Sequence, residues 1–359
     1  MLQNRYGRLA AAVLAGSMLM GAAACGGSED SSAKPADGGS SSAAAGGGKG
    51  AKVGLAYDIG GRGDQSFNDA AAAGLDKAKG ELGLAETKEL EAGNGETEAA
   101  KEERLRLLAD GGYNPIIAIG FAYSGPLKKV AAEFPDTKFA IVDDADATGP
   151  NISNLMFAEH EGSFLVGAAA ALKSKKDHVG FVGGVRVPLI AKFEAGFMAG
   201  AKAVKPDIKI DSKYISEPPD FGGFNDPAKG KTAAQGMFDA GADVVYHAAG
   251  GSGGGVFEAA KAAKGMAIGV DSDQAKTAAS ELQSVIMTSM VKKVDVAVFD
   301  FLKSYADGAV KSGAITYDLK AGGVDYSTTG GQIDDIKTKL DEYKQKIISG
   351  EITVPDKNS

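Results

Sequence analysis

The chain holds a single cysteine, Cys25, among its 359 residues, and it holds no tryptophan. One thiol excludes an intrachain disulfide and any metal site built from several thiolates. Basic residues are outnumbered, with 39 Lys and Arg against 47 Asp and Glu, and no stretch combines basic clusters with aromatics. Nucleic acid is therefore not expected as a partner, because phosphate binding requires a cationic face.

Catalytic signatures are also missing. The sequence contains no G-x-S-x-G motif and no glycine loop followed by a Walker lysine. The stretch GGSGGGV at 250–256 fails the dinucleotide pattern, because Val256 stands where the third glycine belongs. His160, His178 and His247 lack metal-ligand spacing. We therefore expect a binding protein without cofactor or metal, and we expect His247 to have a packing role.

A long apolar run is absent as well. The stretch from Leu9 to Met20 is shorter than the ~20 residues that span a bilayer. It follows Arg5 and Arg8 and precedes GAAAC, which is the layout of a secretory signal peptide over 1–24. A cysteine in this place resembles a lipobox, although Ala22 stands where leucine is most usual. The pattern predicts export and acylation of Cys25, which anchors the protein to the outer face of the cell membrane.

The anchor would be joined to the body by a flexible tether over 25–50, which is rich in Gly, Ser and Ala. From residue 51 onward, short apolar strands alternate with helical segments, and this predicts parallel sheets covered by helices on both faces. A weak echo between KVGLAYDIGG and HVGFVGGVRVP favours two similar lobes with a ligand cleft between them. We expect residues 51–155 plus 288–318 in lobe 1 and residues 156–287 plus 319–359 in lobe 2.

The most informative motif is YDIGGRGDQSFNDAAAAG at 57–74. Its glycines lie at a strand end, and Asp58 and Asp64 offer hydrogen-bond acceptors. Phe67 and Asn68 open the following helix, with Ser66 as its expected N-cap. A ring beside an amide suits a flat heterocycle, since stacking on a base contributes roughly 1–3 kcal/mol. The alternative is an ordinary capped turn with Phe67 in the core.

The motif DIGGRGDQSFND resembles the signature of the basic membrane protein family, the purine-nucleoside receptor lipoproteins of ABC importers. Further segments resemble the family in the same order, from FAIVDD and EGSFLVGAAAAL through FEAGFMAGA and GADVVYHAAGGSGGGV to IGVDSDQ and TSMVKKVD. The resemblance covers nearly all of residues 52–350. It implies a type I periplasmic-binding-protein fold, with two doubly wound parallel-sheet lobes joined by a three-segment hinge. It also implies nucleoside capture for an ABC transporter permease.

The resemblance further implies roles for particular residues. Aromatic rings sandwich the base, with Phe67 as one ring and Phe197 as the second; Phe193, Phe221 and Phe224 are alternatives for the second ring. Asp58 and Asn68 belong to the first lobe's share of the site, and Asp143 faces the base. Asp271 and Lys292 hold the ribose, with Lys293 as the less favoured neighbour of Lys292. Gly250 and Gly251 let the backbone approach the ligand.

Each of these residues also has a plain structural interpretation. Asp143 can be part of a solvated pair with Asp144, Asp271 can cap a turn, and Lys292 can be a surface charge at a helix start. Two other functions share the pattern: a binding protein for a sugar or other small solute, and a ligand-sensing lipoprotein without transport. The enzyme alternative is an anchored nucleoside hydrolase. The hydrolase needs an aspartate cluster for calcium, and DIGGRGD does not supply that spacing.

Overall fold

The computed structural model describes residues 50–357, which form two α/β lobes, each around its own six-stranded sheet. The expected signal peptide, Cys25 and nearly all of the tether lie outside the described residues. Within residues 50–357, no helix is both long enough and apolar enough to cross a membrane.

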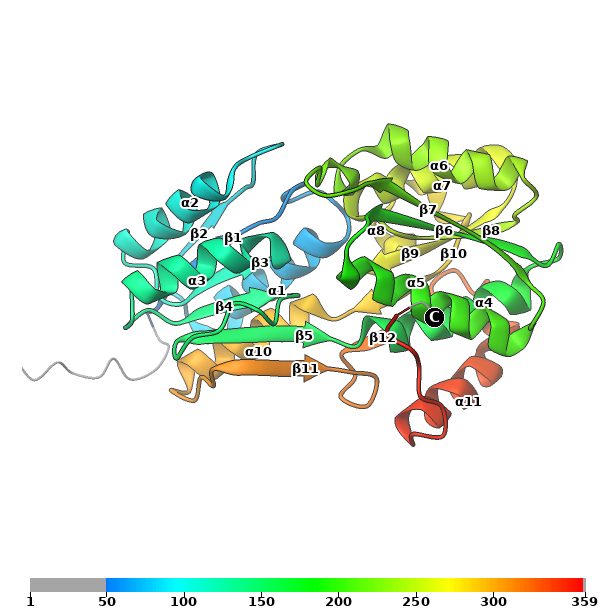
Figure 1. Cartoon of the computed structure of the whole chain (residues 1–359). Coiled ribbons are helices and arrows are strands. Elements are labelled where there is room, and N and C mark those ends of the chain that lie inside the picture. Colours follow the sequence, from blue (N-terminus) through cyan, green and yellow to red (C-terminus); the bar gives the residue numbers. More distant parts are fainter. Residues whose placement is uncertain (1–49, 358–359) are drawn as a thin grey trace, which may run out of the picture. The chain divides into compact units, whose positions relative to one another are not determined.

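The first lobe contains an all-parallel sheet (Figure 1). In spatial order its strands are β11 (Gly313–Tyr317), β5 (Ile152–Phe157), β4 (Phe139–Val142), β3 (Ile116–Ile119), β1 (Lys52–Ala56) and β2 (Glu86–Leu90). Helices α1 (Phe67–Leu82) and α10 (Val294–Ala306) pack on one face, and α2 (Glu98–Asp110) and α3 (Ser124–Glu133) pack on the other. The central strands IIAI and FAIV are apolar throughout because both of their faces are covered.

The second lobe repeats this plan with one antiparallel edge strand, β12 (Val324–Tyr326). The remaining strands, in spatial order, are β10 (Ile286–Lys292), β9 (Met266–Asp271), β8 (Val244–Ala248), β6 (His178–Val185) and β7 (Lys209–Ser216). Helices α4 (Glu159–Lys173) and α5 (Pro188–Val204) cover one face, and α6 (Pro227–Asp239) and α7 (Gly253–Ala263) cover the other. The short helices α8 (Gln274–Thr277) and α9 (Ser280–Gln283) follow β9, and α11 (Lys337–Ile348) packs against α4.

Helices α4 and α5 pack unusually closely, and glycines explain why. A Cβ atom on Gly200 would lie 1.9 Å from the carbonyl oxygen of Phe164, and one on Gly196 would lie 2.1 Å from that of His160. Any side chain at these positions would push the helices apart. The glycines in FEAGFMAGA are therefore required by helix packing.

The chain crosses between the two sheets three times: from β5 into α4, from β10 into α10, and from β11 into β12. The second crossing falls at Lys292–Lys293, not at the expected boundary of 287/288, because β10 pairs with β9 and β12 of the second sheet as far as Lys292. The first boundary likewise falls after Phe157, not at 155/156, since β5 pairs to its end with β11. These shifts place Lys292 directly at a crossing.

Candidate functional site

A pocket lies where the strands of both sheets end. Its lining includes Asp58 after β1, Asp143 after β4, Gly250 after β8, Asp271 at the end of β9 and Lys292 at the end of β10. Parallel strands place their carboxyl ends at the same sheet edge, so residues distant in sequence meet there. The sequence prediction for these five residues therefore agrees with their positions, and their roles toward a ligand stay predictions.

The loop between β1 and α1 is organised by Asp64. Its buried carboxylate accepts hydrogen bonds from the backbone amides of Ser66 at 2.8 Å, Asn68 at 2.9 Å and Asp69 at 3.1 Å. Burial nevertheless raises the pKa of Asp64 to about 6. Ser66 occupies the N-cap position, but its side chain does not cap the helix. The amides at the start of α1 are thus satisfied by Asp64.

Asn68 lines the pocket, yet its amide group is used by the same loop. Its Nδ2 donates to the carbonyl oxygen of Ile59 and to Asp64, and its Oδ1 accepts from the amide of Asp58. An Asn side chain has only two N–H donors, and both are occupied here. Both donors of Asn68 therefore hold the loop that carries Asp58 in this conformation, and a contact between Asn68 and a ligand stays a prediction.

Asp58 is held tightly at the end of β1. Its Oδ1 accepts from the amide of Ile59 at 2.8 Å, and its Oδ2 packs so close to Gly120 that a Cβ atom there would lie at 2.3 Å. Gly120 has φ of 99°, a left-handed conformation that glycine adopts without strain. Burial raises the pKa of Asp58 to about 6, which is well above the usual value for aspartate.

Lys292 is the centre of a buried charge cluster, with its side chain 1% exposed. It pairs with Asp143, and its Nζ lies 3.3 Å from Oε1 of Glu159. Burial lowers the pKa of Lys292, but the neighbouring carboxylates outweigh this effect and raise it, so Lys292 stays charged. Burial raises the pKa of Asp143 to about 6 against the attraction of Lys292. The interpretation of Lys292 as a surface charge is thereby wrong.

Aromatic rings surround the same ammonium group. The Nζ atom of Lys292 lies 5.0 Å from the ring centroids of Phe67 and Phe157 and 5.5 Å from that of Phe193. Phe67 begins α1 in the first lobe, whereas Phe193 belongs to α5 in the second. Cation–π attraction therefore adds to the ion pair and ties both lobes to the end of β10.

Asp143 and Asp271 share an unusual backbone conformation, with φ of 65° and 62°. Non-glycine residues seldom adopt positive φ, and such strain gathers at functional sites. The Oδ1 atom of Asp143 is buried and has no hydrogen-bond partner within residues 50–357. Buried acceptors are normally satisfied, so this oxygen is suited to receive a hydrogen bond from a ligand.

Asp271 joins the two lobes. Its Oδ2 accepts a 2.6 Å hydrogen bond from the hydroxyl of Ser66, which belongs to the first lobe. Ser272 donates to the carbonyl oxygen of Ser66 at 3.1 Å, and Gln274 donates to that of Gln65 at 3.0 Å. The structure therefore represents a closed arrangement in which polar groups of the second lobe hold the start of α1.

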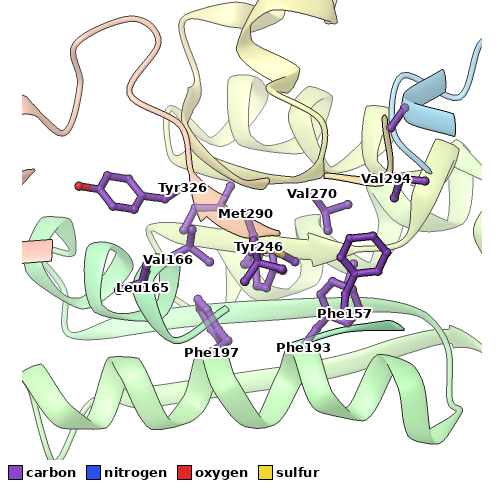
Figure 2. Packing of buried hydrophobic residues seen from close by; sticks show 14 of the residues in the cluster. Phe157, Leu165, Val166, Phe193, Phe197, Tyr246, Val270, Met290, Val294 and Tyr326 are labelled. Carbon is purple, nitrogen blue, oxygen red and sulfur yellow. The ribbon is translucent and has the colours of Figure 1, made fainter. Parts of the chain in front are cut away.

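The prediction that Phe197 forms the second ring of the site is wrong. Phe197 is completely buried in the core of the second lobe, with its ring centroid 5.2 Å from that of Tyr246 (Figure 2). Two of the alternatives line the pocket instead: Phe224, and Phe193, one helical turn earlier than Phe197 on α5. Each turn advances a helix by about 5.4 Å, so only the ring nearer the start of α5 reaches the cleft.

Other parts of the prediction differ in detail. Gly250 lines the pocket with φ of 53°, but Gly251 is not part of its lining and faces Asn225 in a neighbouring pocket. Sequence reasoning missed Glu159, which is fully buried beside Lys292, and Phe121, which lines the pocket after β3. An acidic residue in the first turn of the apolar helix EHEGSFLVGAAAALK was the available signal for Glu159. Phe121 directly follows the glycine after strand IIAI.

His247 is fully buried and has a packing environment. Its Nε2 lies 3.0 Å from Oε1 of Gln274, and its ring lies edge-on to Phe257 at 5.1 Å. Burial lowers the pKa of His247 to about 4, so it is neutral at physiological pH. The described part of the chain holds no group of three or more His, Cys, Asp or Glu residues placed to bind a metal ion.

Comparisons with known proteins agree with this architecture. Residues 51–358 match the Bmp family, described as ABC transporter substrate-binding protein PnrA-like. The CD4+ T-cell-stimulating antigen of Listeria monocytogenes is 36% identical over 85% of this chain and 88% of its own length. The ABC transporter nucleoside-binding protein BmpA of Lactococcus lactis is 35% identical over 85% of this chain and 89% of its own.

Solved structures point the same way. A solute-binding protein of an ABC transporter system from Aeropyrum pernix matches with a TM-score of 0.73 and 29% identity, covering 85% of this chain and 94% of that protein. The arabinose-binding protein AraP of Geobacillus stearothermophilus shares the fold, with a TM-score of 0.57 and 13% identity over 82% of this chain and 99% of its own.

The two lobes and the pocket between them define a solute-binding protein with the type I periplasmic-binding fold. The chain belongs to the Bmp family of PnrA-like substrate-binding proteins of ABC transporters. This confirms the resemblance and the fold class inferred from the sequence. Because the family binds solutes for transporters, the protein is not an enzyme, and its partners are a small molecule and a transporter.

Proposed function

We propose that this protein captures a purine nucleoside between its lobes and delivers it to an ABC importer. The observation that carries the proposal is the composition of the pocket, in which the rings of Phe67 and Phe193 come from opposite lobes beside buried aspartates. Rings offer stacking to a base, and carboxylates accept hydrogen bonds from ribose hydroxyls. The name of the Lactococcus lactis relative, nucleoside-binding protein, agrees with this chemistry.

Closure supplies the mechanism. A ligand that contacts both lobes binds the closed form better than the open form and shifts the population toward it. The unpartnered Oδ1 of Asp143 would accept a hydrogen bond from an N–H group of the base, while Asp271 and Lys292 would hold the ribose. The base would be desolvated between rings, and polar side chains would replace the water around the sugar. No covalent step is needed.

Purine selectivity rests on the family resemblance and is tested by a ligand screen. The purified protein is heated with adenosine, guanosine, inosine, cytidine, uridine, free bases or ribose, and the unfolding temperature is recorded. A ligand at a hundred times its dissociation constant adds about 2.7 kcal/mol of stability. Purine nucleosides should raise the transition, and ribose or free bases should raise it far less. If ribose alone raised the unfolding temperature as much as a purine nucleoside does, the solute would be a sugar.

We also propose that the protein works outside the cytoplasm, held to the membrane by acylated Cys25. The support is the signal-peptide pattern before this residue, together with relatives named as lipoproteins in Pyrococcus abyssi and Pyrococcus horikoshii. One acyl chain gives marginal membrane binding, and several hold firmly. Replacing Cys25 with serine should release the protein from the membrane fraction. Full retention of the variant would contradict anchoring through Cys25.

A further inference from the structure

Three phenylalanines meet across the two lobes. The ring of Phe121 lies edge-on to Phe221 at 5.8 Å and to Phe224 at 6.5 Å, with interplanar angles of 67° and 71°. Phe121 follows β3 in the first lobe, whereas Phe221 and Phe224 lie between β7 and α6 in the second. These ring contacts therefore join the lobes and must separate whenever the lobes move apart.

The three rings do not share one environment. Phe121 and Phe224 line the ligand pocket, but Phe221 does not. Phe221 lines an adjoining pocket, which both lobes form and which shares Asp58 and Ile59 with the ligand pocket. The ring cluster thus lies at the boundary between the two pockets, with Phe221 on its outer side.

The loop that carries Phe221 is fixed within the second lobe. The hydroxyl of Ser252 donates to the carbonyl oxygen of Gly223 at 2.8 Å and accepts from the amide of Asp226 at 2.7 Å. Gly223 also packs so close to the neighbouring strand that a Cβ atom would lie 2.2 Å from the carbonyl oxygen of Gly184. Because this loop is anchored, Phe221 is presented to Phe121 at little entropic cost on closure.

We propose that Phe221 is a positioning residue that slows ligand release without touching the ligand. Its ring braces Phe121 across the lobes, and Phe121 and Phe224 together close the wall of the ligand pocket. An edge-to-face aromatic pair shifts an equilibrium by about two- to tenfold beyond the area it buries. The proposal uses the proposed nucleoside function only for the choice of ligand.

The first measurement needs no ligand. Spin labels on cysteines introduced at Lys128 and Ala262, one exposed position in each lobe, report the distance between the lobes in a Cys25→Ser background. Phe221→Ala should increase the open fraction about two- to tenfold relative to the parent. The matched control is Phe134→Ala, which removes a half-buried ring that packs against the core of the first lobe. An unchanged distance distribution in Phe221→Ala would overturn the proposal that Phe221 stabilises the closed arrangement.

The second measurement follows release of inosine by stopped flow. Phe221→Ala should raise the dissociation rate two- to tenfold and leave the association rate within twofold, and Phe134→Ala should change neither. In a Phe121→Ala background the effect of Phe221→Ala should disappear, because the partner ring is gone. An equal effect in both backgrounds would overturn the proposal. If the parent protein binds no nucleoside, the proposed function fails, and the distance measurement still decides the role of Phe221.

Discussion

The ammonium nitrogen of Lys292 lies 3.3 Å from Oε1 of Glu159, although each residue stands at a different crossing between the lobes. Both side chains are buried, and neither carboxylate oxygen of Glu159 has a hydrogen-bond partner within the described residues. Lys292 therefore compensates the buried carboxylate of Asp143 and, together with Lys192, whose Nζ lies 3.7 Å from Oε2, that of Glu159. Lys292 also lines the pocket, so the same ammonium group belongs both to a crossing between the lobes and to the ligand site.

Replacing Lys292 with methionine should destabilise the ligand-free protein by about 3–5 kcal/mol, because removing one partner of a buried ion pair leaves uncompensated charge. Urea unfolding monitored by circular dichroism measures this change. The control is Lys293→Met, because Lys293 makes no ion pair within residues 50–357. Its free energy of unfolding should change by no more than about 0.5 kcal/mol. Equal stability losses in both variants would show that the cluster is not held by the charge of Lys292.

Two rings on the same helix should respond differently to the same substitution. Phe193→Leu should weaken nucleoside binding by roughly 1–3 kcal/mol, because it removes a ring from the pocket. Phe197→Leu should lower the free energy of unfolding and leave affinity within twofold, because its ring packs on Tyr246 in the core. Calorimetric titration with inosine and urea unfolding separate the two effects. A larger loss of affinity for Phe197→Leu than for Phe193→Leu would show that Phe197 belongs to the binding site.

Asp271→Asn should weaken ribonucleosides by roughly 1.5–3 kcal/mol, the contribution of a hydrogen bond to a charged group. Asparagine keeps an oxygen that can accept from Ser66, so the contact between the lobes is retained. The 2′-deoxynucleosides should lose much less, provided that Asp271 accepts from the 2′-hydroxyl. Titration of both ligand series against both proteins tests this, and equal losses would remove Asp271 from ribose recognition.

Asp58 should make the stability of the ligand-free protein depend on pH. Burial raises its pKa in the folded state from 3.8 to about 6, so folding favours the protonated form. Its contribution to stability is therefore fully present below pH 3.8 and is lost as pH rises toward 6. Asp58→Asn, which stays neutral, should match the parent near pH 4 and exceed it by about 3 kcal/mol above pH 6, at 1.36 kcal/mol per pKa unit.

Urea unfolding across pH 4–7 measures that difference. The variant keeps an oxygen to accept from the amide of Ile59, so the backbone contact at the end of β1 is preserved. A difference between variant and parent that stays constant with pH would show that Asp58 does not titrate with a raised pKa.

Much of the site could be predicted from the sequence because the ends of apolar strands can be recognised in it. Asp143 follows an apolar strand of the first sheet and Asp271 ends one of the second, so the doubly wound pattern places each at the carboxyl edge of its own sheet, where the pocket lies. Lys292 was predicted from the resemblance of TSMVKKVD to the family. The glycine-rich turn at 57–74 was equally informative, because its residues act locally on the start of α1. Periodicity and turn chemistry thus determined the two lobes and the location of the pocket.

Which side chains enter the pocket was decided by packing. Phe193 and Phe197 lie on nearly the same face of α5, and only the crossing of α5 over the sheet separates a pocket ring from a core ring. Asn68 stands where a ligand contact is expected, but its donors are used by Ile59 and Asp64. Glu159 acquires meaning only beside Lys292. The sequence alone determined the elements and their polar ends, since these depend on local pattern, whereas contacts between distant segments were decided by tertiary structure.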